Sequence, residues 1–372
     1  MVPDALSIAA RRRLIEAMPK AELHLHLDGS VRVDTALELA RTRDVDAPRD
    51  WAEMYDALVA PERCADQAEL LRAFDLPIAL MQDAEALERI AFELVRAKAA
   101  DNVRYVEIRW GPLLHIAGGL SLEDGIASVS AGARAAARGG QEVRLICTAL
   151  RSHDPADNAA LAEVAAGFRD RGLTGFDLAG PEEAYPDPLL HRQAFGIARD
   201  AGLHITVHAG EWGGAAQVRR ALEVEPERIA HGPCAIDDDA LCGELIDRGI
   251  PLDLCPTSNV QAGVVPSLAH HPLARLHRTG VQVTLSTDDT TVSDISLSEE
   301  YAHAVDSIGL TLPELWSIDR GALEAAFADE SAVARLRQEF DDWAAGVPEL
   351  GTSPTSVRYA PGGESGKRGA SA

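Results

Sequence analysis

The stretch AELHLHLDGS, residues 21–30, alternates apolar and polar residues over its first six positions and then reaches a turn at Asp28 and Gly29. A period of two is typical of a β-strand, because successive side chains of a strand point to opposite faces. His24 and His26 therefore point to the same side. The stretch predicts the first strand of a sheet, with two imidazoles on its inner face.

Similar short β-rich runs recur along the chain, and each is followed by a helical pattern. Alternation of this kind is typical of a parallel sheet with helical crossovers. The fold class is therefore predicted as α/β, and eight strands are the number that a closed (β/α)8 TIM barrel requires. The candidate strands begin near Glu22, Arg104, Glu142, Thr174, His204, Arg228, Pro251 and Val281.

Capping residues in the sequence predict where several helices begin and end. Asp83 stands where it can cap a helix whose apolar face includes Leu87, Ile90 and Leu94. Gly249 and Gly280 precede later strands and suit left-handed C-terminal caps. Thr311 and Glu314 have the spacing of a capping box, which predicts a helical C-terminal region ending near Trp343.

Two segments lie outside this alternation. The interval from Thr35 to Gln82 is too long for a simple crossover, so we expect extra helices there, placed as a lid over one end of the barrel. Glycine, serine, proline and threonine dominate from Gly351 onward. We therefore assign residues 1–350 to one domain and 351–372 to a flexible tail.

Composition narrows the function classes. The 372 residues carry a formal net charge of -24, which would repel a phosphate backbone, so we expect no nucleic-acid partner. The five cysteines are widely spaced and form no CxxC pair, which favours buried thiols in a reducing compartment. Neither a secretion signal nor a membrane span is recognisable, so we predict a cytoplasmic protein without a membrane partner.

Further polar side chains stand where later strands end: His208, His231, and the pair Asp288 and Asp289. Barrel enzymes build active sites from the C-terminal ends of different strands, so we expect these groups to meet His24 and His26. Taken singly, a strand-end histidine can bond a carbonyl and an aspartate pair can cap a helix. Taken together, imidazoles with a carboxylate favour zinc, iron or cobalt over magnesium or calcium, and zinc leads.

The chain resembles the adenosine deaminase family of the amidohydrolase superfamily from about Lys20 to Glu300. The matching stretches, in order, are PKAELHLHLDGS, VRYVEIRWGP, FDLAGPE, VHAGE, RIAHG, CPTSN and STDD. The resemblance implies one zinc per chain and a purine nucleoside as ligand. Residue by residue, it implies zinc ligands His24, His26, His208 and Asp288, a proton donor Glu211, a catalytic histidine His231, and substrate contacts from Asp28, Gly180, Asp289 and Phe74.

Elementary chemistry is consistent with these roles. Zinc lowers the pKa of a bound water toward neutrality, which provides a nucleophile for an aromatic carbon. Attack at purine C6 builds electron density on the ring, so an acid at N1 lowers the barrier, and Glu211 is the natural candidate. His231 can orient the water. Asp289 is expected to project away from Asp288, as neighbours on a strand do.

The expected reaction is the conversion of adenosine or 2'-deoxyadenosine to the corresponding inosine and ammonia. Adenine and aminodeoxyfutalosine are alternative substrates, although Asp28 favours a ribose because base-specific deaminases of this kind usually carry glutamate there. Leu70 stands where the family's lid often has an aromatic residue.

Two other classes of protein agree less well with this sequence. A binuclear amidohydrolase needs a lysine at the end of a central strand to bridge two metals, and the three lysines, Lys20, Lys98 and Lys367, do not meet that need. A non-catalytic nucleoside-binding relative would not be expected to keep the full set of acid, metal and catalytic positions. The sequence does not determine the oligomeric state.

Overall fold

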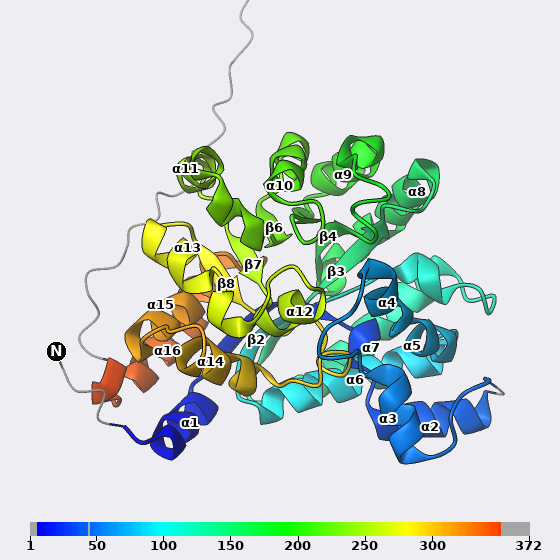
Figure 1. Ribbon diagram of the computed structural model, residues 1–372. Helices are drawn as coiled ribbons and strands as arrows, with labels where there is room; N and C mark the ends of the chain where they lie inside the picture. Colours follow the sequence, from blue (N-terminus) through cyan, green and yellow to red (C-terminus); the bar gives the residue numbers. More distant parts are fainter. Residues whose placement is uncertain (1–5, 44, 351–372) are drawn as a thin grey trace, which may run out of the picture.

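The computed structural model describes residues 6–43 and 45–350, and its centre is a sheet of eight parallel strands in sequence order (Figure 1). The last strand returns to the first, since Leu25 and Asp288 form a parallel bridge. The (β/α)8 prediction is confirmed. The strands are β1 (Lys20–His26), β2 (Val103–Trp110), β3 (Glu142–Leu150), β4 (Leu173–Ala179), β5 (His204–Ala209), β6 (Arg228–His231), β7 (Leu252–Leu254) and β8 (Val283–Leu285).

Helices connect the strands and surround them, and α8 to α11 form one side of that outer layer in Figure 1. They are α1 (Ile8–Ala17), α2 (Val33–Thr42), α3 (Trp51–Leu58), α4 (Gln67–Arg72), α5 (Asp75–Leu80), α6 (Ala84–Ala100), α7 (Leu122–Ala136), α8 (Pro155–Ala166), α9 (Arg192–Asp200), α10 (Ala215–Ala221), α11 (Asp239–Arg248), α12 (Pro256–Gln261), α13 (Leu273–Thr279), α14 (Leu297–Asp306), α15 (Leu312–Ala322) and α16 (Glu330–Ala344).

Local signals in the sequence account for several helix ends. The Asp83 side chain accepts a hydrogen bond from the amide of Ala86 at the start of α6. Thr311 and Glu314 form both bonds of a capping box on α15. Gly249 and Gly280 adopt left-handed conformations, with φ of 62° and 96°, directly after α11 and α13. These predictions are confirmed because each depends on residues within one turn.

The long interval after β1 forms helices α2 to α5, as expected. Leu70 and Phe74 belong to a small apolar cluster, separate from the main core, that also contains Trp212, Ala262 and Val292. Helices of six residues such as α4 and α5 are too short to be stable alone. Contacts with the loops after β5, β7 and β8 therefore hold this cover in place.

Inside the barrel, a row of fully buried charges crosses from strand to strand. Arg228 on β6 pairs with Glu107 on β2 and, through Nε at 2.8 Å, with Asp253 on β7. Arg109 on β2 lies 3.7 Å from Asp253 and 3.3 Å from Asp177 on β4. Opposite charges alternate along the row, so each buried charge has a partner.

Two expectations are outside what the structure tests. The C-terminal tail lies beyond the described residues, and the assignment of residues 1–350 to one domain stays a prediction. Among the described residues, no helix combines the length and the apolar character needed to cross a bilayer.

The buried row predicts a large stability effect. Replacing Arg228 with methionine leaves Glu107 and Asp253 facing each other without that cation, so we expect the free energy of unfolding to fall by about 3–5 kcal/mol. Arg248→Met removes a surface pair with Glu244 and should cost less than about 1 kcal/mol. Urea unfolding of both variants measures the two losses in the free energy of unfolding. Equal losses would contradict the stabilising role of the buried charge row.

Candidate active site

Four of the predicted side chains meet at the C-terminal end of the barrel. The Nε2 atom of His26 lies 3.3 Å from Nε2 of His24 and 3.2 Å from Nε2 of His208. Oδ1 of Asp288 lies 3.0 Å from His24 Nε2 and 3.4 Å from His26 Nε2. One ligand atom from each of the four lies within 4.8 Å of the others. Segments far apart in sequence thus form one compact cluster.

The donor set fits a small divalent cation. Ligands placed tetrahedrally around zinc at 2.0–2.1 Å lie about 3.3 Å apart, which is close to the spacing of these nitrogens. Burial lowers the pKa of His24 well below its usual value and that of His26 to about 4, so both rings are neutral and offer lone pairs. Nδ1 of His208 lies 3.0 Å from Asp177, which fixes the ring with Nε2 toward the cluster.

Two residues at this cluster have strained backbone conformations. His231 and Asp288 have left-handed φ values of 66° and 65°, which residues with a side chain rarely adopt. Such conformations cost about 1–3 kcal/mol and gather at functional sites. The hydroxyl of Ser258 donates to Asp288 at 2.7 Å and helps to hold it.

One expectation about Asp288 and Asp289 is wrong. Strand β8 ends at Leu285, so the two aspartates stand in the loop that follows rather than on a strand. They do not face opposite sides of a sheet, because the turn at Asp288 lets both side chains line the same pocket.

Glu211 lies beside the cluster, just after β5. Burial, followed by the negative charge of Asp288, raises the pKa of Glu211 to about 8. The carboxyl is therefore protonated at neutral pH in the metal-free protein. Its Oε2 atom lies 3.9 Å from Nε2 of His231. A neutral acid and an imidazole thus share one wall of the pocket.

A chain of hydrogen bonds orients His231. The side-chain amide of Asn259 lies 3.2 Å from Nδ1 of His231, and its oxygen lies 3.2 Å from Nε2 of His271. Burial lowers the pKa of His271 to about 3, so that ring is neutral and donates to Asn259. Asn259 in turn donates to Nδ1 of His231, which leaves the proton of a neutral His231 on Nε2, toward Glu211.

The pocket above the cluster has a volume of about 420 Å³. Burial, together with the charges of Asp288 and Asp28, raises the pKa of Asp289 well above its usual value, and its Oδ1 atom has no hydrogen-bond partner. Burial alone would raise the pKa of Asp28, but His115 lowers it. The pocket is lined by all of the predicted site residues except the fully buried His24, and also by Leu70, Leu71, Ile78, Leu114, Leu150 and Trp212.

Several residues that support this site were not assigned a role from the sequence. Asp177, Ser258 and Asn259 lie within the stretches FDLAGPE and CPTSN, so their positions were available but their roles were not assigned. His115 lies 3.7 Å from Asp28 and no motif marked it. Trp212 follows Glu211 directly, and only its size and place beside the acid could have singled it out.

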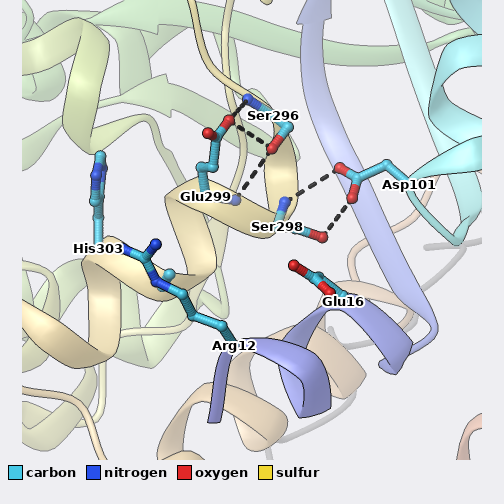
Figure 2. Close-up of a pocket in the computed structure, with 8 residues that line it drawn as sticks. Arg12, Glu16, Asp101, Ser296, Ser298, Glu299 and His303 are labelled. Carbon is cyan, nitrogen blue, oxygen red and sulfur yellow. Dashed lines mark hydrogen bonds between the residues drawn. The ribbon is translucent and has the colours of Figure 1, made fainter. Parts of the chain in front are cut away.

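Another hollow, of about 390 Å³, lies between α1 and the start of α14 (Figure 2). Asp101 accepts hydrogen bonds from the amide and hydroxyl of Ser298, and Ser296 with Glu299 forms a capping box. Figure 2 shows these bonds between the residues that line the hollow. They satisfy the first amides of α14, so the polar groups there have a structural explanation.

Three solved structures that match this architecture are named as an amidohydrolase or a deaminase. An amidohydrolase from Burkholderia ambifaria with bound Zn is 28% identical, with a TM-score of 0.83 over 92% of this chain and 96% of that chain. The N6-methyl-AMP deaminase from Arabidopsis thaliana is 31% identical, with a TM-score of 0.79 over 90% and 99%. The adenine deaminase from Arthrobacter aurescens is 26% identical, with a TM-score of 0.80 over 88% and 99%. Fold and site together define a barrel hydrolase of the amidohydrolase class.

Sequence comparison narrows the class. Residues 19–343 match the family model for adenosine deaminase. Adenosine deaminase from Clostridium perfringens (strain 13 / Type A) is 36% identical over 328 residues, which cover 86% of this chain and 97% of that protein. Adenosine deaminase from Mycobacterium sp. (strain KMS) is 38% identical over 331 residues, which cover 84% and 91%. The chain belongs to the adenosine deaminase family and is an aminohydrolase.

Close packing at Gly29 gives a test of this geometry. A Cβ atom at Gly29 would lie 1.6 Å from Oδ1 of Asp289, so alanine must displace that buried carboxyl. We expect Gly29→Ala to lower the free energy of unfolding by about 1–3 kcal/mol. Gly196→Ala, where nothing lies within 4 Å, is the matched control and should not destabilise the protein. Urea unfolding measures both, and a Gly29 variant as stable as the control would show that this packing is wrong.

Proposed function

We propose that the protein hydrolyses the exocyclic amino group of adenosine and 2'-deoxyadenosine, giving the inosine compounds and ammonia, with one zinc ion per chain. One observation carries the proposal: the cluster of three histidines and Asp288 opens into the same pocket as the carboxyl of Glu211. Family membership gives the reaction class, and the pocket supports the choice of substrate.

His24, His26, His208 and Asp288 would hold the zinc, since their ligand atoms converge and the histidines are neutral. When bound, the ion supplies a nucleophile at neutral pH by lowering the pKa of a water molecule. Burial alone would raise the pKa of Asp288, but His24 and His231 lower it well below its usual value, so the residue carries the negative charge a cation needs.

Glu211 would donate a proton to the purine ring, and His231 would orient the attacking water. Addition at purine C6 moves electron density onto N1, and a protonated Glu211 donates to that atom. His231, with its proton on Nε2 and its Nδ1 bonded to Asn259, orients the water that adds. Both side chains lie on the cluster side of the pocket, where C6 has to sit.

The rest of the pocket would bind the nucleoside. A neutral Asp289 can donate to N7 of the purine, the backbone of Gly180 can meet N3, and Asp28 can accept from a ribose hydroxyl. Phe74 and Leu70 supply an apolar cover. Since burial costs a polar group its water, each of these contacts favours a substrate that offers the matching group.

The charge of the pocket favours a nucleoside over a nucleotide. Five carboxyl groups line it, from Asp28, Asp75, Glu211, Asp288 and Asp289, and neither lysine nor arginine does. Glu211 and Asp289 are neutral in this assignment, but a 5'-phosphate, with about -1.5 to -2 charges, would still find no arginine or lysine on the lining to pair with. We therefore do not expect this protein to prefer the nucleotide named for the N6-methyl-AMP deaminase from Arabidopsis thaliana, and adenine and aminodeoxyfutalosine remain as alternative substrates.

The binuclear alternative has no lysine to use among the described residues. Lys20 starts β1, at the far end of the barrel from the cluster, and donates to carbonyl oxygens there. Lys98 is on α6, with Nζ 2.7 Å from the buried carboxylate of Glu22. We therefore infer a single metal ion.

The test of the proposal is a substrate panel followed by ultraviolet absorbance. With one equivalent of zinc per chain, we expect adenosine and 2'-deoxyadenosine to have the highest kcat/KM, and AMP a value at least about 100-fold lower. Metal-free protein should be inactive and recover with one equivalent. Preference for AMP, adenine or aminodeoxyfutalosine would overturn the substrate assignment, and a need for two zinc ions would overturn the metal assignment.

Glu211→Gln should keep zinc but lower kcat by about 10²–10⁴, because glutamine has no acidic proton to give. In the unmodified enzyme the protonated form is active, so kcat/KM should fall as pH rises through the pKa of Glu211. That pKa is about 8 in the metal-free protein, and a nearby cation moves it lower. Near-normal turnover in the variant, measured with its zinc content, would contradict the role.

A further inference from the structure

The loop that carries Glu211 has its backbone amides fixed by one carboxylate. Glu182 accepts hydrogen bonds from the amides of Gly210 at 2.7 Å, Trp212 at 2.8 Å and Gly213 at 3.1 Å. The bonds lie on both sides of Glu211 in the sequence. Glu182 is only 3% exposed, so these bonds form away from competing water.

A buried cation holds the same segment from its other end. Nη2 of Arg151 donates to the carbonyl oxygen of His208 at 2.9 Å, and Nη1 donates to that of Tyr185 at 3.1 Å. Arg151 directly follows β3, and Glu182 stands three residues after β4. Residues that follow β3 and β4 thus contact the backbone of residues 208–213, which form the end of β5 and the loop after it.

The loop after β5 needs these hydrogen bonds because its glycine-rich sequence does not favour any single backbone conformation. Residues 209–214 read AGEWGG, and Gly210 and Gly214 have positive φ values of 74° and 68°. Glycine has the largest conformational freedom to lose on folding, so the loop has no intrinsic reason to hold one shape. Bonds to a charged acceptor are roughly twice as strong as those between neutral groups.

We propose that Glu182 and Arg151 are positioning residues that hold the loop and thereby set the place of the Glu211 carboxyl. The role rests on the proposed function of Glu211. Neither Glu182 nor Arg151 lines the pocket, so neither is expected to touch the substrate. Their effect should therefore fall on kcat, through the acid, and leave substrate affinity nearly unchanged.

The experiment compares Glu182→Gln with Glu183→Gln in zinc-loaded protein. Glutamine has the same shape as glutamate, but only its oxygen can accept a hydrogen bond. Its NH2 group is a donor and would face backbone N–H groups, which are also donors. Glu183 is the neighbouring residue, exposed and outside the pocket, so its variant controls for loss of one negative charge. Kinetics, zinc content and thermal unfolding are measured for both, and hydrogen exchange is measured for the peptide spanning residues 209–214.

We expect Glu182→Gln to lower kcat about 100-fold, since a displacement of about 1 Å in a reacting group can cost that much. KM for adenosine should stay within about threefold, zinc content should be unchanged, and the amides of the 209–214 peptide should exchange faster. The Glu183 variant should match the unmodified protein in every measurement. Arg151→Met should repeat the kinetic pattern from the other end of the segment.

Two results would overturn the proposal. One is a Glu182 variant with kcat within twofold of the unmodified protein. The other is a loss of kcat accompanied by equal loss of zinc or of folded protein, which indicates a general structural role. Failure of the proposed function is a separate result, because the unmodified protein would then not deaminate adenosine. In that case the exchange measurement still decides whether Glu182 holds the loop.

Discussion

Buried charge is the constraint on which this structure depends. A row of alternating acidic and basic side chains runs through the barrel, from Glu107 through Arg228, Asp253 and Arg109 to Asp177, and ends on the ring of His208. An isolated charge at these positions would cost several kcal/mol, so each depends on its neighbours for compensation. The row therefore links the packing of the barrel interior to the orientation of a side chain in the candidate metal centre. The ion pairs that stabilise the barrel interior therefore also help to fix the position of the His208 ring.

The carboxyl groups of the pocket show how surroundings assign different chemistry to the same functional group. Asp288 stands among histidines, which lower its pKa below the usual range, whereas burial and neighbouring carboxylates raise those of Asp289 and Glu211. One group is thus suited to bind a cation, and the other two can give hydrogen bonds or protons. Pairs of acids separated in this way are typical of sites that carry out acid–base chemistry.

The sequence predicts the barrel, the helix caps and the meeting of His24, His26, His208 and Asp288, because strand periodicity and local capping decide them. It wrongly puts Asp288 and Asp289 on a strand, because strand β8 ends at Leu285 and Asp288 adopts a left-handed turn bonded to the backbone of β1, which no local pattern encodes. The roles of Asp177, Arg151 and Glu182 also depend on which strand ends become neighbours in space. Residues that act by bonding to other parts of the backbone carry no periodic signal, and so sequence reasoning passed over them.

The two lysines within the described residues, Lys20 and Lys98, are 0% and 3% exposed. Arginine supplies the other side-chain cations of that part of the chain, and a guanidinium does not react with the acylating reagents that label amines. Attachment to a surface or a dye through amine chemistry would therefore find no accessible lysine on the barrel. The mouth of the pocket would stay free of label, which makes such coupling suitable for a protein whose entrance must remain open.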